Sequence, residues 1–141
     1  MRTIAQILNE SKTVAVVGLS PKPERPAGHV AEYLQQQGYR ILPVNPAYAG
    51  GQLLGEPVHA TLREASESLG VGDTIDIVDC FRNSDDMPDV ARDAIEVRAK
   101  CLWMQLGVIN QSAADLATAA GLDVVMDHCM LIEHSALRED A

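Results

Sequence analysis

The chain has 141 residues, of which 47% are hydrophobic, and a formal net charge of -9 from 20 acidic and 11 basic side chains. This length suits a single domain spanning 1–141 around one core. The acidic balance argues against a nucleic acid partner, because binding to phosphate backbones needs a basic surface. No apolar run approaches the ~20 residues that cross a membrane, and the N-terminus lacks the apolar core of a signal peptide. We therefore expect no membrane partner and a cytoplasmic location.

Residues 1–60 predict a helix, a strand, a helix, a strand and a loop, in that order. The apolar run at 13–18 stops at Gly18, as a buried strand before a turn would. The second strand contains Pro43, which a central strand disfavours because proline lacks the amide donor. The expected elements are a leading helix at 3–11 within segment 1–12, strand 13–18, helix 26–37, strand 39–44, and a loop at 47–60 with at most a short extended piece at 57–58.

Residues 61–141 continue the alternation of helix and strand. Thr61 and Glu64 have the spacing of a capping box at the start of a helix, and Ser84 is expected to cap the next one. The expected elements are helix 61–69, strand 75–81, a helix from 84, strand 101–106, a helix from Asn110 or Ser112 to Gly121, strand 124–126, and a C-terminal tail at 127–141 with a short apolar patch.

The five expected strands are separated by roughly the ~30 residues of a βαβ unit. Right-handed crossovers between them predict an α/β, Rossmann-like, doubly wound fold with a five-stranded, mainly parallel sheet and helices on both faces. In such a fold the ligand crevice lies at the carboxyl ends of the strands. The residues that follow each strand are therefore the candidates for a site.

The first such loop contains Gly18-Leu19-Ser20, followed by Lys22 and Arg25. A strand that ends at a glycine turn before a helix presents unpaired backbone N–H groups, which suit a phosphate. The two cations could frame a pyrophosphate or a ribose phosphate, and the planar fork of arginine holds two phosphate oxygens at once. The alternative is a solvated loop in which Glu24 pairs with one of the cations.

The glycine pattern argues against NAD. A dinucleotide fingerprint reads G-x-G-x-x-G, whereas here Gly18 stands alone and Gly28 follows ten positions later. The second strand ends in Asn45, so the carboxylate that usually holds a ribose hydroxyl is missing. A neutral residue there tolerates a phosphate near the ribose.

Two later strand ends carry weaker signals. Arg82 follows the third strand and could bind an anion, or could form an ion pair with Asp85 or Asp86. The turn 105–107, Gln-Leu-Gly, could offer backbone groups to a ligand, or could be an ordinary turn between a strand and a helix.

Several segments resemble the small bacterial CoA-binding proteins, which are themselves similar to the CoA-binding domain of the succinyl-CoA synthetase α subunit. The matching segments run in family order over about 13–134: VVGLSPKP at 16–23 with Arg25-Pro26, YRILPVNP at 39–46, LGEPV at 54–58, DIVD at 76–79 with Phe81-Arg82, WMQLG at 103–107, and VMDHC at 125–129. The resemblance implies a Rossmann-like domain that holds coenzyme A or an acyl-CoA across the carboxyl ends of the strands.

The resemblance also implies where the ligand lies. The loop from Gly18 to Arg25 would meet the nucleotide phosphates, Asn45 and Pro46 would lie by the adenosine, and the later loops would border the pantetheine arm. The implied cofactor-binding residues are Gly18, Leu19, Ser20, Lys22, Arg25, Asn45, Pro46, Phe81, Arg82, Gln105, Leu106 and Gly107. Catalysis is not implied, because the synthetase acts through a phosphorylated histidine in a later domain that has no counterpart in this sequence.

The run Asp127-His128-Cys129, with Glu133 and His134 nearby, is the one cluster that could carry chemistry. Cysteine and histidine could form a nucleophile and base, or two metal ligands, but neither set is complete. A structural role is favoured, and we assign no catalytic and no metal-binding residue. His128 stands where family members often have a basic residue, so a charge contact there would depend on pH.

The cysteines number three, and their odd number and wide spacing do not indicate a disulfide scaffold. Cys80 and Cys101 lie in apolar strand-like runs, which predicts buried, small hydrophobic residues. Cys129, if exposed near the crevice, could form a mixed disulfide with the CoA thiol.

The sequence therefore predicts a protein that binds CoA or an acyl-CoA without itself completing a reaction. One alternative is a CoA-binding subunit that serves an acyl-CoA synthetase partner. A weaker one is an NAD(P)-dependent oxidoreductase. A protein partner and a homo-oligomer both stay open.

Overall fold

The computed structural model describes residues 1–139. At its centre lies a five-stranded sheet in the order β2-β1-β5-β6-β7, in which every pairing is parallel. The strands are β1 (Thr13–Val17), β2 (Arg40–Val44), β5 (Ile77–Cys80), β6 (Cys101–Met104) and β7 (Asp123–Val125). This sheet confirms the expected Rossmann-like α/β fold.

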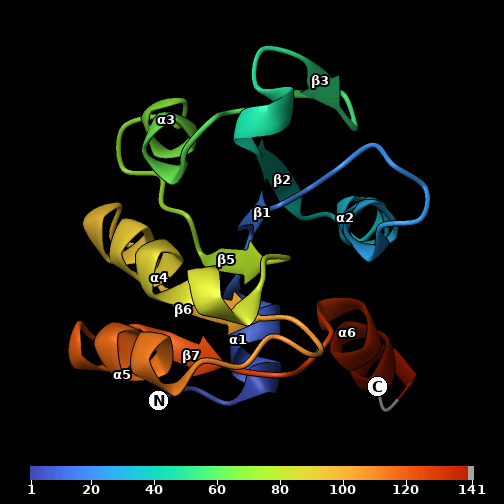
Figure 1. The fold of residues 1–141 in the computed structure, drawn as a ribbon. Helices are drawn as coiled ribbons and strands as arrows, with labels where there is room; N and C mark the ends of the chain where they lie inside the picture. Colours follow the sequence, from blue (N-terminus) through green and yellow to red (C-terminus); the bar gives the residue numbers. More distant parts are fainter. Residues whose placement is uncertain (140–141) are drawn as a thin grey trace.

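Helices cover both faces of the sheet (Figure 1). One buried cluster joins strand residues to α3 (Leu62–Glu67), α4 (Met87–Glu96) and α5 (Gln111–Ala119). The other joins the opposite strand residues to α1 (Ile4–Glu10), α2 (Pro26–Gln36) and α6 (Met130–Glu139). Because both faces are covered, successive residues of β1 are buried in turn on each side, which explains its uninterrupted apolar run.

Pro43 fits because β2 is an edge strand. The Pro43 carbonyl accepts a hydrogen bond from His59 N at 3.0 Å, on the side of β2 that faces away from β1. In a parallel ladder the N–H and C=O of one residue point to the same side, so the missing donor of Pro43 also faces outward. No hydrogen bond to β1 is lost.

Three segments differ from the expectations. Segment 127–141 is predicted to be a tail, but its described part, residues 127–139, contains α6, whose Met130 is fully buried beside α1 and α2; residues 140–141 lie outside the described residues. Ser84 does not cap α4: it starts the short helix η2 (Ser84–Asp86), and its Oγ accepts a hydrogen bond from Ile109 N at 3.0 Å. The loop at 47–60 holds the helix η1 (Pro46–Tyr48) and a hairpin of β3 (Gln52–Leu53) and β4 (Glu56–Pro57).

Within residues 1–139 the longest helix has 11 residues, and none has the length and apolar character needed to span a membrane.

Gly18 closes the carboxyl end of β1 in a position that excludes a side chain. Its φ is +93°, and a Cβ atom added there would lie 2.3 Å from the carbonyl oxygen of Phe81. Neighbouring bonds fix the contact, since Gly18 N donates to Val44 O and Phe81 N donates to Val17 O, both at 2.8 Å. The ends of β1, β2 and β5 are thereby held together.

Asp79 is a carboxyl group inside the core, in the middle of β5, with no exposed surface. Its Oδ1 accepts a hydrogen bond from Gln105 Nε2 at 2.6 Å, whereas Oδ2 has no partner among the described residues. Burial raises the pKa of Asp79 to about 7, and the hydrogen bond from Gln105 offsets part of that rise. The ionised form of this residue therefore destabilises the fold.

We expect Gly18→Ala to destabilise the protein by more than ~1 kcal/mol, because the new methyl group would meet a backbone carbonyl and the positive φ strains an alanine. Gly28→Ala is the matched control, since Gly28 lies inside α2 and its added Cβ would come no closer than 3.4 Å to Ser20 O. That change should be neutral or stabilising by up to ~1 kcal/mol. Urea denaturation measures both, and equal losses would contradict the role given to the Phe81 contact.

We expect Asp79→Asn to remove a pH dependence of stability. The folded pKa of about 7 lies above the unfolded value near ~3.9, so the native state holds a proton that the unfolded state has lost, and stability falls as pH rises through this window. The asparagine cannot ionise. Between about pH 5.5 and about pH 8, the free energy of unfolding of wild type should therefore fall by about 2 kcal/mol relative to that of the Asp79→Asn variant. A difference that does not change with pH would overturn the assignment.

Candidate functional site

A cavity of about 680 Å³ lies at the carboxyl ends of β1, β5 and β6. It is bordered by the β1–α2 loop, the first turns of α2, the loops after β2, β5 and β6, and the start of α6. Its lining residues are Gly18, Ser20, Lys22, Arg25, Pro26, Ala27, Val30, Asn45, Pro46, Tyr48, Phe81, Arg82, Asn83, Gln105, Leu106, Val108, Cys129 and Ile132. This is the point where the chain leaves β1 and β5 in opposite directions across the sheet, as the topology of doubly wound folds predicts for a binding crevice.

Of the twelve residues implied by the sequence, all but Leu19 and Gly107 line this cavity. Leu19 is buried in the core, and its carbonyl accepts a hydrogen bond from Asn45 Nδ2 at 3.1 Å. Gly107 N donates to Asp127 Oδ1 at 2.7 Å, so this glycine anchors the turn after β6. Both residues support the walls of the cavity from outside it.

The sequence did not single out seven lining residues: Pro26, Ala27, Val30, Tyr48, Asn83, Val108 and Ile132. Those in α2 could have been found, because the first turns of a helix that follows a binding loop face the same crevice. Ile132 could not have been found in this way, because the sequence predicts a tail rather than a helix for its segment. Cys129, considered from the sequence only if it lay near the crevice, also lines the cavity.

One end of the cavity is cationic. Lys22 and Arg25 have no carboxylate partner in the part of the chain that the structure describes, so Glu24 does not neutralise them. The loop is held by its own backbone: Ser20 Oγ accepts from Lys22 N at 3.2 Å, and Arg25 N donates to Lys22 O at 3.0 Å. Arg25 is also the N-cap residue of α2 and makes no side-chain cap. Cations and an uncapped helix start therefore face the same space.

Arg82 differs from these two cations. Its Nη2 lies 3.4 Å from Asp86 Oδ2, one helical turn further along the chain. The ion pair anticipated as an alternative for Arg82 is thus present, and part of its charge is balanced.

Asn45 is bound at both ends of its amide. Its Oδ1 accepts from Ala47 N at 3.0 Å, and its Nδ2 donates to the Leu19 carbonyl. An aspartate could not make the second bond, because an ionised carboxylate has no donor. The neutral side chain at the end of β2 therefore has a structural reason in addition to the room it leaves for a ligand.

The wall contributed by the loop after β6 and the start of α6 is apolar. Leu106 and Ile132 form its rim with exposed fractions of 65% and 56%, and Val108 and Cys129 lie beside them. Within this wall Gln105 is only 4% exposed, and it is the residue bonded to Asp79. The cavity thus runs from positive charge near α2 to apolar surface near α6.

The histidines of the 127–134 cluster are held by neighbouring side chains. His128 Nδ1 lies 2.7 Å from Glu133 Oε1, and the His128 carbonyl accepts a hydrogen bond from Trp103 Nε1 at 2.8 Å. His134 Nδ1 lies 2.8 Å from the Tyr33 hydroxyl, and burial lowers the pKa of His134. Among residues 1–139 no three His, Cys, Asp or Glu side chains are grouped to hold a metal ion.

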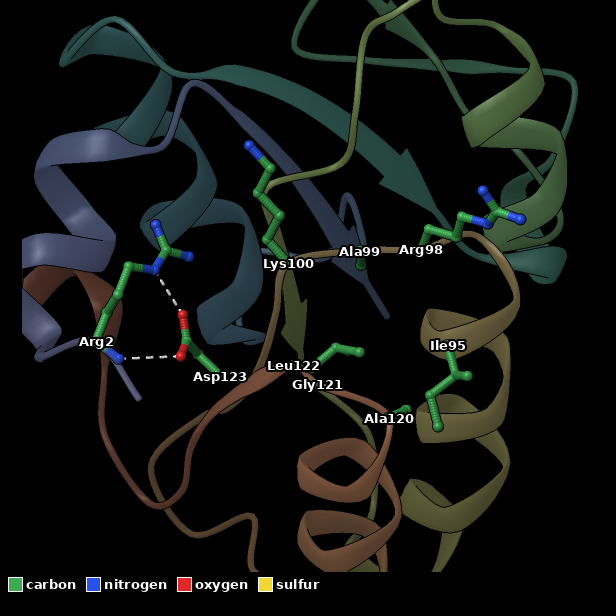
Figure 2. Close-up of a pocket in the computed structure, with 9 residues that line it drawn as sticks. All are labelled: Arg2, Ile95, Arg98, Ala99, Lys100, Ala120, Gly121, Leu122 and Asp123. Atoms are coloured by element: carbon green, nitrogen blue, oxygen red, sulfur yellow. Dashed lines mark hydrogen bonds and ion pairs between the residues drawn. The ribbon is translucent and has the colours of Figure 1, made fainter.

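A second cavity, of about 410 Å³, lies at the opposite end of the sheet (Figure 2). Three cations border it, but their side chains point in different directions. Arg2 turns to Asp123, with Nε 2.6 Å from Oδ2, and Lys100 pairs with Asp76 at 3.6 Å. Because the charges do not converge on one point, we take the first cavity as the candidate site.

Known proteins resemble this chain over nearly its whole length. The sequence pattern described as "CoA binding domain" matches residues 12–135. The "Uncharacterized protein YneT" of Bacillus subtilis (strain 168) is 36% identical over 135 residues, which cover 96% of this chain and 94% of that protein. A solved structure from Thermus thermophilus, described as cell-free ID.343, has a TM-score of 0.86 at 36% identity and covers 95% of this chain and 96% of its own.

A more distant likeness concerns the fold alone. The dinucleotide-forming acetyl-coenzyme A synthetase 1 of Ca. Korarchaeum cryptofilum has a TM-score of 0.67 at 20% identity, over 86% of this chain and 27% of that one. With the family pattern spanning nearly all of its residues, this chain belongs to the CoA binding domain family.

Proposed function

We propose that this protein binds coenzyme A or an acyl-CoA in the cavity at the carboxyl ends of β1, β5 and β6, and that it does not complete a reaction by itself. The observation that carries the proposal is the polarity of that cavity. Lys22 and Arg25, which have no carboxylate partner within residues 1–139, line it beside the start of α2, and the exposed apolar side chains of Leu106 and Ile132 line it after β6 and in α6. CoA has the matching polarity, with phosphates at one end and a flexible arm ending in a thiol at the other.

The cationic end suits the nucleotide phosphates. Charge-assisted hydrogen bonds from lysine and arginine to phosphate are about twice as strong as neutral ones. The start of α2 adds backbone N–H groups and the positive end of the helix dipole. Asn45, Pro46 and Tyr48 lie beyond the cations on the β2 side and would meet the adenosine.

The same surfaces suit a nicotinamide dinucleotide less well. No second glycine follows Gly18 at the fingerprint spacing. Both the oxygen and the nitrogen of the Asn45 amide form hydrogen bonds within the protein. Neither His128 nor His134 lines the cavity; they bond Glu133 and Tyr33. These contacts support a binding role over hydride transfer or covalent catalysis.

A second candidate is a CoA-binding subunit that serves an acyl-CoA synthetase. The likeness to about a quarter of an acetyl-CoA synthetase chain favours it, because that enzyme has a region of this shape within a longer chain. A stable synthetase-like partner recovered with the tagged protein would support this role.

We expect CoA and acetyl-CoA to raise the Tm of the protein, and NAD, NADP and ATP to raise it less or not at all. A ligand at 100 times its Kd stabilises the native state by ~2.7 kcal/mol, which a thermal-shift assay resolves in a domain of this size. A shift with NADP and none with CoA would reject the proposed function.

We expect Arg25→Ala to weaken CoA binding by about tenfold or more, and Arg82→Ala by less, because Asp86 already balances the Arg82 charge. Isothermal titration calorimetry measures both. Arg92→Ala serves as the control: Arg92 is an exposed arginine on α4 that pairs with Asp89 and lies outside the cavity lining. Equal losses for Arg25→Ala and Arg82→Ala would contradict the assignment of the phosphate end.

A further inference from the structure

We infer that Gln105, oriented by the buried carboxylate of Asp79, presents its side-chain oxygen Oε1 to the cavity as a hydrogen-bond acceptor for an N–H donor on the apolar arm of the ligand. This inference rests on the proposed CoA-binding function and adds a contact that recognises the pantetheine arm of CoA. Gln105 would bind the ligand, and Asp79 would act through it as a positioning residue.

The orientation of the Gln105 amide follows from its partner. Gln105 Nε2 donates to Asp79 Oδ1 at 2.6 Å, and above the Asp79 pKa of about 7 the ionised carboxylate can only accept hydrogen bonds. The NH₂ end of the amide must therefore face Asp79, which leaves Oε1 on the other side. Neither side chain can rearrange freely, because Asp79 has no exposed surface and Gln105 is 4% exposed.

The free end of this amide faces the ligand cavity. Gln105 lines the cavity, and its Oε1 makes no hydrogen bond with the described residues. It is also not among the buried side-chain atoms that lack a partner in residues 1–139, which are Ser11 Oγ, His59 Nε2 and Asp79 Oδ2. The acceptor therefore keeps some accessible surface, and the space that Gln105 borders is the cavity.

The surroundings of Gln105 favour the arm of CoA over its phosphates. Leu106, Val108 and Ile132 make this part of the wall apolar. A hydrogen-bond acceptor of the ligand would find no donor there and would lose its hydrogen bonds to water, which is unfavourable. Phosphate oxygens are acceptors and would be repelled by Oε1. The pantetheine arm carries amide N–H groups, and a buried acceptor of fixed direction discriminates strongly for a donor.

The test compares two ligands, CoA and adenosine 3′,5′-bisphosphate, which lacks the arm. Titrations at about pH 8 keep Asp79 ionised. Gln105→Leu removes the acceptor at nearly constant size and should weaken CoA binding about tenfold, with the affinity for the bisphosphate unchanged. Gln111→Leu is the matched control, since Gln111 Nε2 donates to Asp115 Oδ1 at 2.9 Å on the exposed surface of α5. It should change neither affinity.

Asp79 is tested by rescue. Asp79→Leu should weaken CoA binding several-fold and should have no further effect in the Gln105→Leu background. Asp79→Asn keeps an oxygen for Gln105 Nε2 and should bind CoA as wild type does. If Asp79→Leu fails to fold, the Gln105→Leu titrations with the two ligands decide alone.

Three results would count against parts of the scheme, each in a different way. Wild type that fails to bind CoA rejects the proposed function itself. Wild type that binds CoA, with Gln105→Leu unchanged, rejects only the acceptor role of Gln105. Equal losses for CoA and the bisphosphate would place Gln105 near the nucleotide and overturn its assignment to the arm.

Discussion

The end of β1 depends on the contact between the Gly18 backbone and the Phe81 carbonyl. β1 lies between β2 and β5, and hydrogen bonds tie it to both neighbours as far as its last residue. A side chain at position 18 would need the space that the Phe81 carbonyl occupies. The loops bearing the cations, Asn45 and Arg82 all leave from these three strand ends. Gly18 therefore allows the strand ends that carry these loops to lie as close together as they do.

The net charge of -9 and a ligand rich in phosphate are compatible because of where the charges lie. Arg2, Arg63, Arg92 and Lys100 all pair with carboxylates away from this cavity, whereas Lys22 and Arg25 have no carboxylate partner within residues 1–139. At physiological ionic strength charges more than ~8 Å apart are largely screened. The repulsion from the acidic surface is then weak at the site, and the two local cations decide the interaction with an anion.

The strands and the site loops could be predicted from the sequence because their causes are local. Uninterrupted β-branched runs indicate strands buried on both faces, and Arg82 finds Asp86 at the spacing of one helical turn. The Asp79–Gln105 contact could not be predicted from the sequence, because it joins two residues that only the register of β5 and β6 brings together. Cys129 and Ile132 reach the cavity only because α6 packs against α1 and α2.

The position of Asp79 connects the stability of the sheet to the wall of the proposed binding cavity. A carboxyl group with one bonded oxygen and one unpartnered oxygen costs the fold free energy that an apolar residue would not. Destabilising groups of this kind concentrate where a protein acts, because elsewhere they are replaced without loss of function. Here the cost falls on a strand that ends at the cavity, and the same carboxyl fixes the amide of Gln105. A side chain already held in one orientation loses little further entropy when a ligand binds, so the carboxyl group that destabilises the core would strengthen the proposed site.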